Sequence, residues 1–159
     1  YDEYKTIDCL GLDYVEFRCP PGTAANIALF YETIFDATIS VYEDVCIVAL
    51  GLVDSNGRAD QSLIFRESDV ATPYDGHHIS MYVGETSADY ERAFAHALQA
   101  GIVWVNPRFS DKTMDIEGAR QWKQFRLKDI IDVETGEVLM ELEHEMRSIE
   151  HESWPGSKQ

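Results

Sequence analysis

Three glutamates alternate along one apolar segment near the end of the chain, and their spacing could supply acid–base chemistry. Glu141 stands between Met140 and Leu142, and Glu143 and Glu145 follow at intervals of two residues. Side chains two residues apart on a β-strand share one face of the sheet. Carboxylates that share a face can split their pKa values, so that one acts as the acid and another as the base. The alternative for this row is a solvated edge of the sheet.

A histidine in a second strand-like segment adds a group that titrates near neutral pH. His78 opens the segment His78–Val83, and His77 before it falls on the opposite face by strand alternation. We expect His78 to act as an acid or a base, and the alternative is a histidine hydrogen-bonded in the core. For His77 we expect a structural role.

Two further groups of side chains could orient a small molecule. Tyr14 and Glu16 share one face of a predicted strand, where the tyrosine hydroxyl could stabilise an oxyanion or simply fill the core. Trp122, Gln124 and Arg126 share one face of another predicted strand. Arg126 is one of only 13 basic residues, so it suits either an anionic or enolic substrate or a salt bridge with the surplus carboxylates.

The elements that must position these residues repeat one plan at an offset of 64 residues. The strand-like segments that begin at Tyr14 and His78 are separated by this offset, and a helix-like stretch follows each of them. A repeat of this kind predicts two similar half-domains that share one cleft.

The first unit reads as a strand, a helix and three further strands. Thr23 predicts the helix N-cap, and Asp36 ends the helix. Residues 54–57 form a strong turn signal between the last two strands. The predicted elements lie at 12–19, 24–35, 38–42, 45–50 and 61–66.

The second unit follows the same plan. Thr86 or Ser87 predicts the N-cap of an amphipathic helix, and Gly101 follows its last turn. The stretch Asn106–Gly118 is polar and shows no helical or strand periodicity, which indicates an insertion or a loop over the cleft. The predicted strands lie at 78–83, 102–105, 122–127 and 138–143.

Length and composition predict one domain at 1–150, with units at about 12–70 and 76–147 and a C-terminal tail at 151–159. The net charge of −16 argues against nucleic acids and anionic membranes, because phosphate binding needs clustered Lys and Arg. No apolar run approaches the roughly 20 residues of a membrane span. Three cysteines without metal-site spacing favour reduced thiols, so we expect a cytoplasmic protein.

Two consecutive β-α-β-β-β units of this length resemble the vicinal oxygen chelate superfamily. Its members include glyoxalases, bleomycin-resistance proteins, fosfomycin-resistance enzymes, methylmalonyl-CoA epimerases and extradiol dioxygenases. The resemblance covers residues 12–147 and rests on the segments 12–17, 76–83 and 125–142. It implies an α+β fold in which two βαβββ units form a cupped mixed sheet around one site.

The resemblance also implies where a metal ion would bind. In such proteins the metal, where present, is held by the first and last strands of each unit, commonly by His and Glu. The matching positions of the second unit are His78 and Glu141. In the first unit Tyr14 stands where His is usual, and Glu67 lies just beyond a last strand without a matching carboxylate. The implied ligand set is thus half complete, for a divalent Fe, Mn, Ni, Zn or Mg ion.

The function that the resemblance implies is an enzyme acting on a small oxygenated organic molecule. The reaction would be isomerase, lyase or ring-cleavage and oxygenase chemistry through an enolate-like species. One alternative is a metal-free binding protein of the drug-sequestering, bleomycin-resistance type, and another is a metal-free acid/base enzyme on the same cup. The expected partners are a small-molecule substrate and a second copy in a homodimer. The expected site residues are Tyr14, Glu16, His78 and Glu141 for catalysis, Trp122, Gln124, Arg126 and Glu143 for substrate binding, and His78 and Glu141 for the metal.

Overall fold

A computed structural model describes residues 12–53 and 59–154 of the chain. Cys9, the turn signal at 54–57 and the last residues of the predicted tail lie outside the described residues. The first unit comprises β1 (Tyr14–Cys19), α1 (Ala24–Phe35), β2 (Ile39–Val41), β3 (Val45–Val53) and β4 (Ala59–Glu67). The second comprises β5 (His78–Tyr82), α2 (Ser87–Gln99), β6 (Val103–Trp104), α3 (Ile116–Trp122), β7 (Gln124–Ile131) and β8 (Val138–Arg147).

Each unit forms one four-stranded mixed sheet with the same topology. The strand orders are β1-β4-β3-β2 and β5-β8-β7-β6, so the first strand of each unit pairs with its last strand in parallel. The remaining pairs are antiparallel. The repeat predicted from the sequence is therefore confirmed as two β-α-β-β-β units in an α+β fold.

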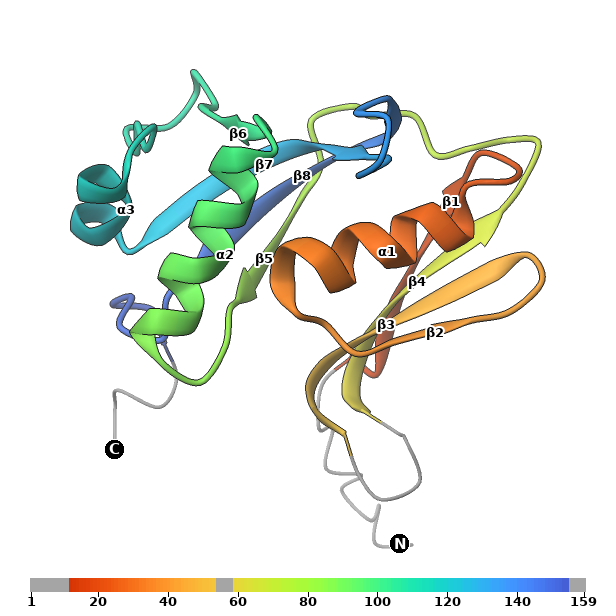
Figure 1. Cartoon of the computed structure of the whole chain (residues 1–159), viewed down its shortest axis with the longest axis horizontal. Coiled ribbons are helices and arrows are strands. Elements are labelled where there is room, and N and C mark those ends of the chain that lie inside the picture. The colour runs from red at the N-terminus through yellow and green to blue at the C-terminus, as the bar shows by residue number, and fades with distance from the viewer. Residues whose placement is uncertain (1–11, 54–58, 155–159) are drawn as a thin grey trace, which may run out of the picture.

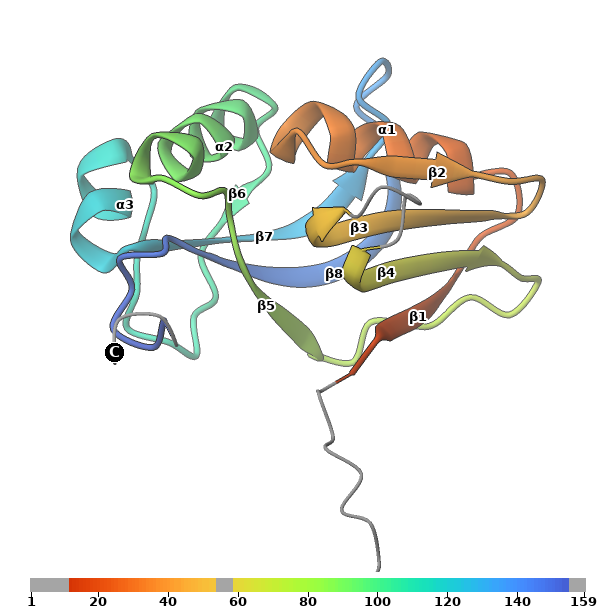
Figure 2. The same ribbon diagram turned by 90° about the horizontal axis from the view of Figure 1, so that it is seen from below.

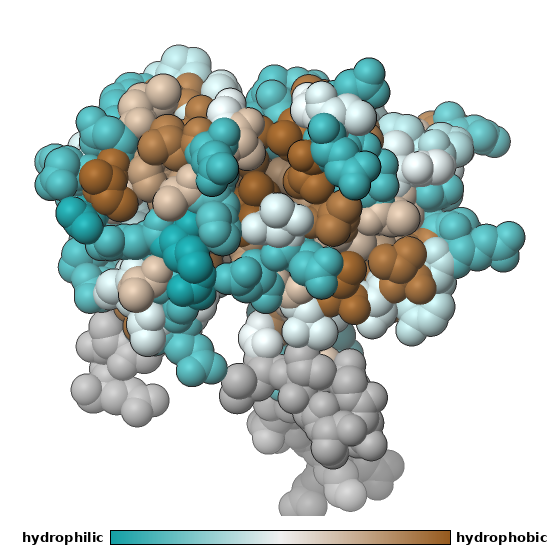
Figure 3. All heavy atoms as spheres, viewed as in Figure 1, coloured by the Kyte–Doolittle hydropathy of each residue, from teal (hydrophilic) through white to brown (hydrophobic). Residues whose placement is uncertain are grey.

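The two main helices lie on the same side of the two sheets (Figures 1 and 2). Each helix buries one apolar stripe, as its 3.6-residue pattern requires. The stripe of α1 includes Ile27, Phe30 and Ile34, and that of α2 includes Tyr90 and Phe94. Hydrophobic residues remain visible on the helix-covered face, interspersed with hydrophilic ones (Figure 3).

Polar contacts join the two units on this helical side. His144 of β8 is fully buried and its Nε2 lies 2.6 Å from the hydroxyl of Tyr31 in α1. Asn26 of α1 donates to Asp132 after β7 at 2.7 Å. These contacts tie α1 of the first unit to the sheet of the second.

The two helices begin with different caps. Thr86, one of the two residues predicted as the N-cap of α2, forms a capping box with Asp89. Thr23 precedes α1, but its hydroxyl donates to the Pro20 carbonyl at 2.6 Å instead of capping the helix. The first amide of α1, that of Ala24, donates to the Glu67 carboxylate at 2.9 Å.

The second unit contains a helix that the sequence pattern did not predict. Asp115 caps α3 by accepting a hydrogen bond from the Gly118 amide at 2.8 Å. Trp122 ends this helix, so its prediction as the first residue of a strand was wrong. Lys123 then takes a left-handed conformation, with φ of 54°, before β7 begins. None of the helices within 12–53 and 59–154 is long and apolar enough to span a membrane.

Candidate functional site

The face of the second sheet opposite the helices carries Glu143 and Glu145, two of the three alternating glutamates. Glu143 and Glu145 of β8 lie across from His78 and Ser80 of β5 in the parallel register. On the other side of β8, Glu145 lies across from Arg126 of β7. Strand alternation therefore places these side chains on one face, as their spacing predicts.

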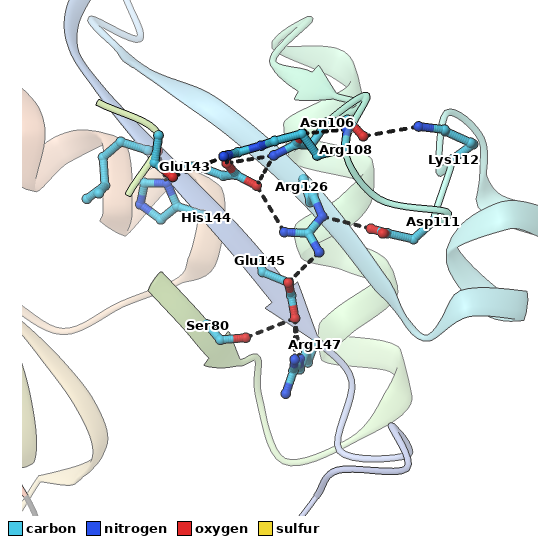
Figure 4. A network of polar contacts seen from close by, with 12 residues as sticks. Ser80, Asn106, Arg108, Asp111, Lys112, Arg126, Glu143, His144, Glu145 and Arg147 are labelled. Atoms are coloured by element: carbon cyan, nitrogen blue, oxygen red, sulfur yellow. Dashed lines mark hydrogen bonds and ion pairs between the residues drawn. The ribbon is translucent and has the colours of Figure 1, made fainter. Parts of the chain in front are cut away.

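Arg126 lies at the centre of a buried ionic network on this face (Figure 4). Its Nε donates to Asp111 at 2.8 Å, its Nη1 donates to Glu143 at 3.0 Å, and its Nη2 pairs with Glu145. Burial by itself lowers the pKa of Arg126, but the three carboxylates outweigh it and hold the pKa above its usual value. The guanidinium is thus a permanent cation with a carboxylate at each of its three nitrogens.

Glu143 is fully buried and has several partners besides Arg126. The amide nitrogen of Asn106 donates to both of its oxygens at 2.9 Å, and the Tyr74 hydroxyl donates at 3.1 Å. Nη2 of Arg108 lies 3.6 Å from the same carboxylate. Burial and the neighbouring Glu143 raise the pKa of Tyr74, so this phenol stays protonated and keeps donating.

Glu145 extends the network toward the end of β8. It accepts from the Ser80 hydroxyl at 3.1 Å and from Nε of Arg147 at 2.6 Å. Burial would raise the pKa of Glu145, but Arg126 and Arg147 outweigh it and lower the pKa. Glu145 is therefore an ionised carboxylate at neutral pH.

The loop between β6 and α3 folds back over this network. The Phe109 ring lies with its centroid 4.2 Å from Cζ of Arg126, a cation–π contact. Asp111 from the same loop supplies one of the three carboxylates. The aperiodic stretch that predicted a loop over the cleft thus lies on the site face, and Asp111 is a site residue that the sequence did not single out.

A cavity of about 660 Å³ opens beside the network. Its lining includes Trp122, Gln124, Arg126, Glu145, Arg147 and His151. The structure therefore brings the three predicted substrate-binding residues of 122–126 to one cavity, although Trp122 reaches it from α3. The fourth, Glu143, lies in the adjoining network.

His151 is a cavity residue from the stretch that the sequence indicated only as a tail. Its Nδ1 accepts a hydrogen bond from the Ser153 amide at 3.2 Å, so the proton of the neutral ring is on Nε2. Burial, followed by the charge of Arg147, lowers the pKa of His151. The imidazole is therefore neutral at pH 7. No pattern in the sequence indicated this residue, because it follows the last strand in a turn.

His78 and Glu141 lie on neighbouring strands but are not opposite one another. The residue across from His78 is Glu143, and Glu141 is displaced by two residues along β8. The Glu141 carboxylate is about half exposed and pairs with the Lys128 ammonium. The His78 ring contacts Phe109 edge-on, with centroids 6.1 Å apart.

Tyr14 and Glu16 belong to the first sheet and have different surroundings. Glu16 pairs with Arg66 of β4, with Nε and Oε1 3.2 Å apart, and Tyr14 is 57% exposed. Among the described residues, no hydrogen bond or ion pair joins either of them to His78 or Glu141. Their polar contacts thus link the two predicted catalytic residues of the first unit to neighbours within their own sheet.

These donors do not fit a six-coordinate divalent ion as they are placed. Glu143 and Glu145 are neutralised by arginines, Glu141 by Lys128, and Glu67 of the first unit caps α1. Within residues 12–53 and 59–154 no group of three or more His, Cys, Asp or Glu side chains is arranged to hold a metal ion. A divalent ion would have to displace cations that already occupy the carboxylates.

No family model and no curated protein matches the chain. Solved structures do match its fold. Oxidase ChaP-H2 aligns with a TM-score of 0.60 and 17% identity, covering 92% of this chain and 98% of its own. A possible glyoxalase from Bacillus cereus aligns with a TM-score of 0.52 and 12% identity, covering 87% and 98%. The fosfomycin resistance protein FosX from Listeria monocytogenes, complexed with Mn(II), aligns with a TM-score of 0.51 and 11% identity, covering 87% and 91%. The chain therefore has the two-unit fold of the vicinal oxygen chelate superfamily.

Proposed function

We propose that the chain binds a small oxygenated organic molecule in the cavity of the second unit and acts on it by acid–base chemistry without a divalent metal ion. The observation that carries the proposal is the position of the cavity, which borders both the Arg126 network and a neutral histidine. Ligand sites commonly combine a concave surface with a few polar groups of perturbed pKa. Fosfomycin resistance, oxidase and glyoxalase proteins with the same fold support a small-molecule function.

The roles in this proposal follow from the state of each group at neutral pH. Trp122 offers an aromatic wall for the body of the molecule, and Gln124 a hydrogen-bonding amide. The Arg147 guanidinium offsets negative charge that develops on an enolate-like oxygen. His151, with its proton on Nε2, hydrogen-bonds to the substrate oxygen and stabilises the enolate-like state, while the α-proton passes to solvent water and a solvent proton later returns to the same carbon.

The experiment is exchange of carbon-bound hydrogen for deuterium. Small ketones, hydroxy ketones and oxo acids are incubated with the protein in D2O, with chelator present, and their α-protons are followed by NMR. We expect exchange above the buffer rate for at least one class, and its loss in His151→Gln. His96→Gln is the matched control, because His96 lies on α2 outside this cavity. Exchange that is absent, or that survives His151→Gln, overturns the acid–base proposal.

Binding without chemistry is the second candidate, and one observation favours it. Asp111, Glu143 and Glu145 each pair with an arginine, so no unpaired carboxylate of the network is available as a base. Saturable binding of a small molecule, seen as a raised Tm without α-proton exchange, would support this candidate over the enzyme.

The metal-dependent form of the function keeps His78 and Glu141 as its predicted ligands. It requires that Lys128 release Glu141. Metal analysis of protein purified without chelator tests it, together with the Tm in MnCl2. Stoichiometric metal that is lost in His78→Ala would support this form and contradict the metal-independent one.

A further inference from the structure

The loop tip formed by Phe109, Ser110 and Asp111 contacts Arg126 as a bound ligand would. It presents an aromatic face 4.2 Å from Cζ of the guanidinium and a carboxylate 2.8 Å from its Nε. We propose that this tip is a built-in occupant of a binding site for aromatic carboxylates, and that such a ligand replaces it at Arg126. The inference rests on the proposed function, because the ligand enters through the same cavity.

Asp111 is the replaceable carboxylate among the three around Arg126. Glu143 and Glu145 belong to β8, where backbone pairing to β5 and β7 fixes them, and each has hydrogen-bond donors besides Arg126. The Asp111 carboxylate comes from a loop, and its recorded side-chain partner within the described part of the chain is Arg126 alone. A ligand carboxylate at this position would take over that one contact.

The charges of the network favour a ligand with one negative charge. Arg108, Arg126 and Arg147 face Asp111, Glu143 and Glu145, so the network is balanced three against three (Figure 4). Withdrawal of Asp111 leaves the network with one net positive charge and leaves Nε of the buried Arg126 without its acceptor, which is costly unless an anion replaces the carboxylate. A monoanionic carboxylate restores the balance, whereas a neutral or cationic molecule does not.

The loop is anchored on both sides of the tip. Before the tip, Asn106 donates to Glu143, and Arg108 donates to the Gly76 carbonyl at 3.2 Å. After it, the Lys112 ammonium donates to the Asn106 carbonyl at 3.1 Å, and the buried Thr113 donates to the Gln124 carbonyl at 2.9 Å. The Phe109 amide also donates to the Asn106 carbonyl at 3.2 Å, so the Phe109 ring and residues 110 and 111 are the parts that can swing out while the ends of the loop keep their contacts.

The cavity already borders the tip. Phe109, Ser110 and Asp111 line it together with Trp122 and Arg126. An aromatic carboxylate in the cavity would meet the tip directly, and Trp122 offers its ring a second aromatic surface. Both parts of the departing tip, the ring and the carboxylate, are then reproduced by the ligand.

The test is calorimetric titration of the protein with phenylacetate and 3-phenylpropionate. Acetate is the control that keeps the carboxylate but lacks the ring, and 2-phenylethylamine is the control that keeps the ring but carries a positive charge. We expect the two aryl carboxylates to bind and the controls to fail. Asp111→Ala removes the internal competitor, so it should tighten aryl carboxylate binding by roughly tenfold or more, the size of a charged hydrogen bond. Asp129→Ala is the matched control, since Asp129 is an exposed carboxylate of β7 beside Lys128. It should leave the affinity unchanged.

A second variant covers the case in which Asp111→Ala does not fold. Phe109→Ala removes the ring of the tip and should also tighten the binding of phenylacetate. Unchanged or weaker binding in the folded tip variants overturns the inference. If other oxygenated molecules bind the cavity but no aryl carboxylate does, the inference fails and the proposed function stands. If aryl carboxylates bind as expected but no α-proton exchange occurs, the inference stands and the acid–base proposal fails.

Discussion

The Tyr31 hydroxyl donates a hydrogen bond to Nε2 of His144 across the boundary between the two units. The direction follows from the other ring nitrogen, since Nδ1 lies 2.6 Å from the Leu142 carbonyl, which can only accept. Nδ1 therefore carries the proton of the neutral ring. Both residues are buried, so neither group can exchange its partner for water.

Replacement of Tyr31 by Phe should destabilise the chain by about 1–3 kcal/mol. The change leaves Nε2 of the buried His144 without a donor, and an unsatisfied buried acceptor costs its desolvation energy. The measurement is the free energy of unfolding from urea titration at pH 7. Tyr42→Phe is the control, because Tyr42 is 60% exposed, and it should change stability by less than about 0.5 kcal/mol. Equal effects of the two changes would contradict the assignment.

Stability should fall as the pH drops from about 6.5 to 4. Burial lowers the pKa of His144 to about 4, whereas the unfolded chain has the ordinary value of 6.5. The unfolded state therefore binds a proton first, so stability is complete above pH 6.5 and declines by about 3 kcal/mol toward pH 4.

The effect is isolated by measuring the free energy of unfolding of His144→Gln as a function of pH. The variant is less stable than the parent at pH 7, but its free energy of unfolding should change less between pH 6.5 and 5. This window lies above the pH range in which carboxylates titrate. His151→Gln shows the share of the other histidine, because the pKa of His151 is also lowered, by burial first, and adds to the same decline. A parallel pair of profiles for parent and His144→Gln would show that another group causes the decline.

Arg126→Met should be among the most destabilising single changes in the chain. It leaves Asp111, Glu143 and Glu145 buried together without their shared cation, at a cost of about 3–5 kcal/mol. Arg120→Met is the matched control, since Arg120 pairs with Glu91 at the surface, where such pairs contribute about 0–1 kcal/mol. Denaturant unfolding of both variants gives the comparison. A loss below about 1 kcal/mol for Arg126→Met would mean that the network is dispensable.

Glu67→Ala should weaken the start of α1. The carboxylate accepts from the Ala24 amide, and hydrogen bonds from Gly22 and Ala24 lower the pKa of Glu67. Loss of a helix cap costs about 0.5–2 kcal/mol, measured as a shift in the urea midpoint. Because the pKa is depressed in the folded state, this contribution is present above pH 4.5 and is lost at more acidic pH. Glu43→Ala, an exposed carboxylate of the same unit, should show no comparable shift.

The sequence predicted the repeat, the two main helices and the strand faces, because each depends on local periodicity. It also placed Gln124 and Arg126 on one face and offered a salt bridge as the alternative for Arg126. The register between β5 and β8 decides which carboxylate lies across from His78, and no local sequence pattern encodes this register. The sequence could therefore not show that Glu143, rather than Glu141, lies across from His78.

Contacts over long sequence distance account for the other differences. Asp111 lies in an aperiodic loop, so nothing marked it as a partner of Arg126. Glu67 looked like a residue just beyond a ligand position, yet it caps a helix 43 residues earlier in the chain. Trp122 was assigned to a strand because α3 is too short, at 7 residues, to show a helical period.

Because the ionic network on the second sheet is balanced, the electrostatic field inside the site differs from the field at the outer surface of the chain. The chain carries a net charge of −16, but the three arginines and three carboxylates around the site cancel. The field that an approaching molecule meets comes from the outer surface, which salt screens over about 10 Å, while the buried pairs are screened far less. Ionic strength should therefore change how fast a charged molecule arrives and leave its residence time nearly constant.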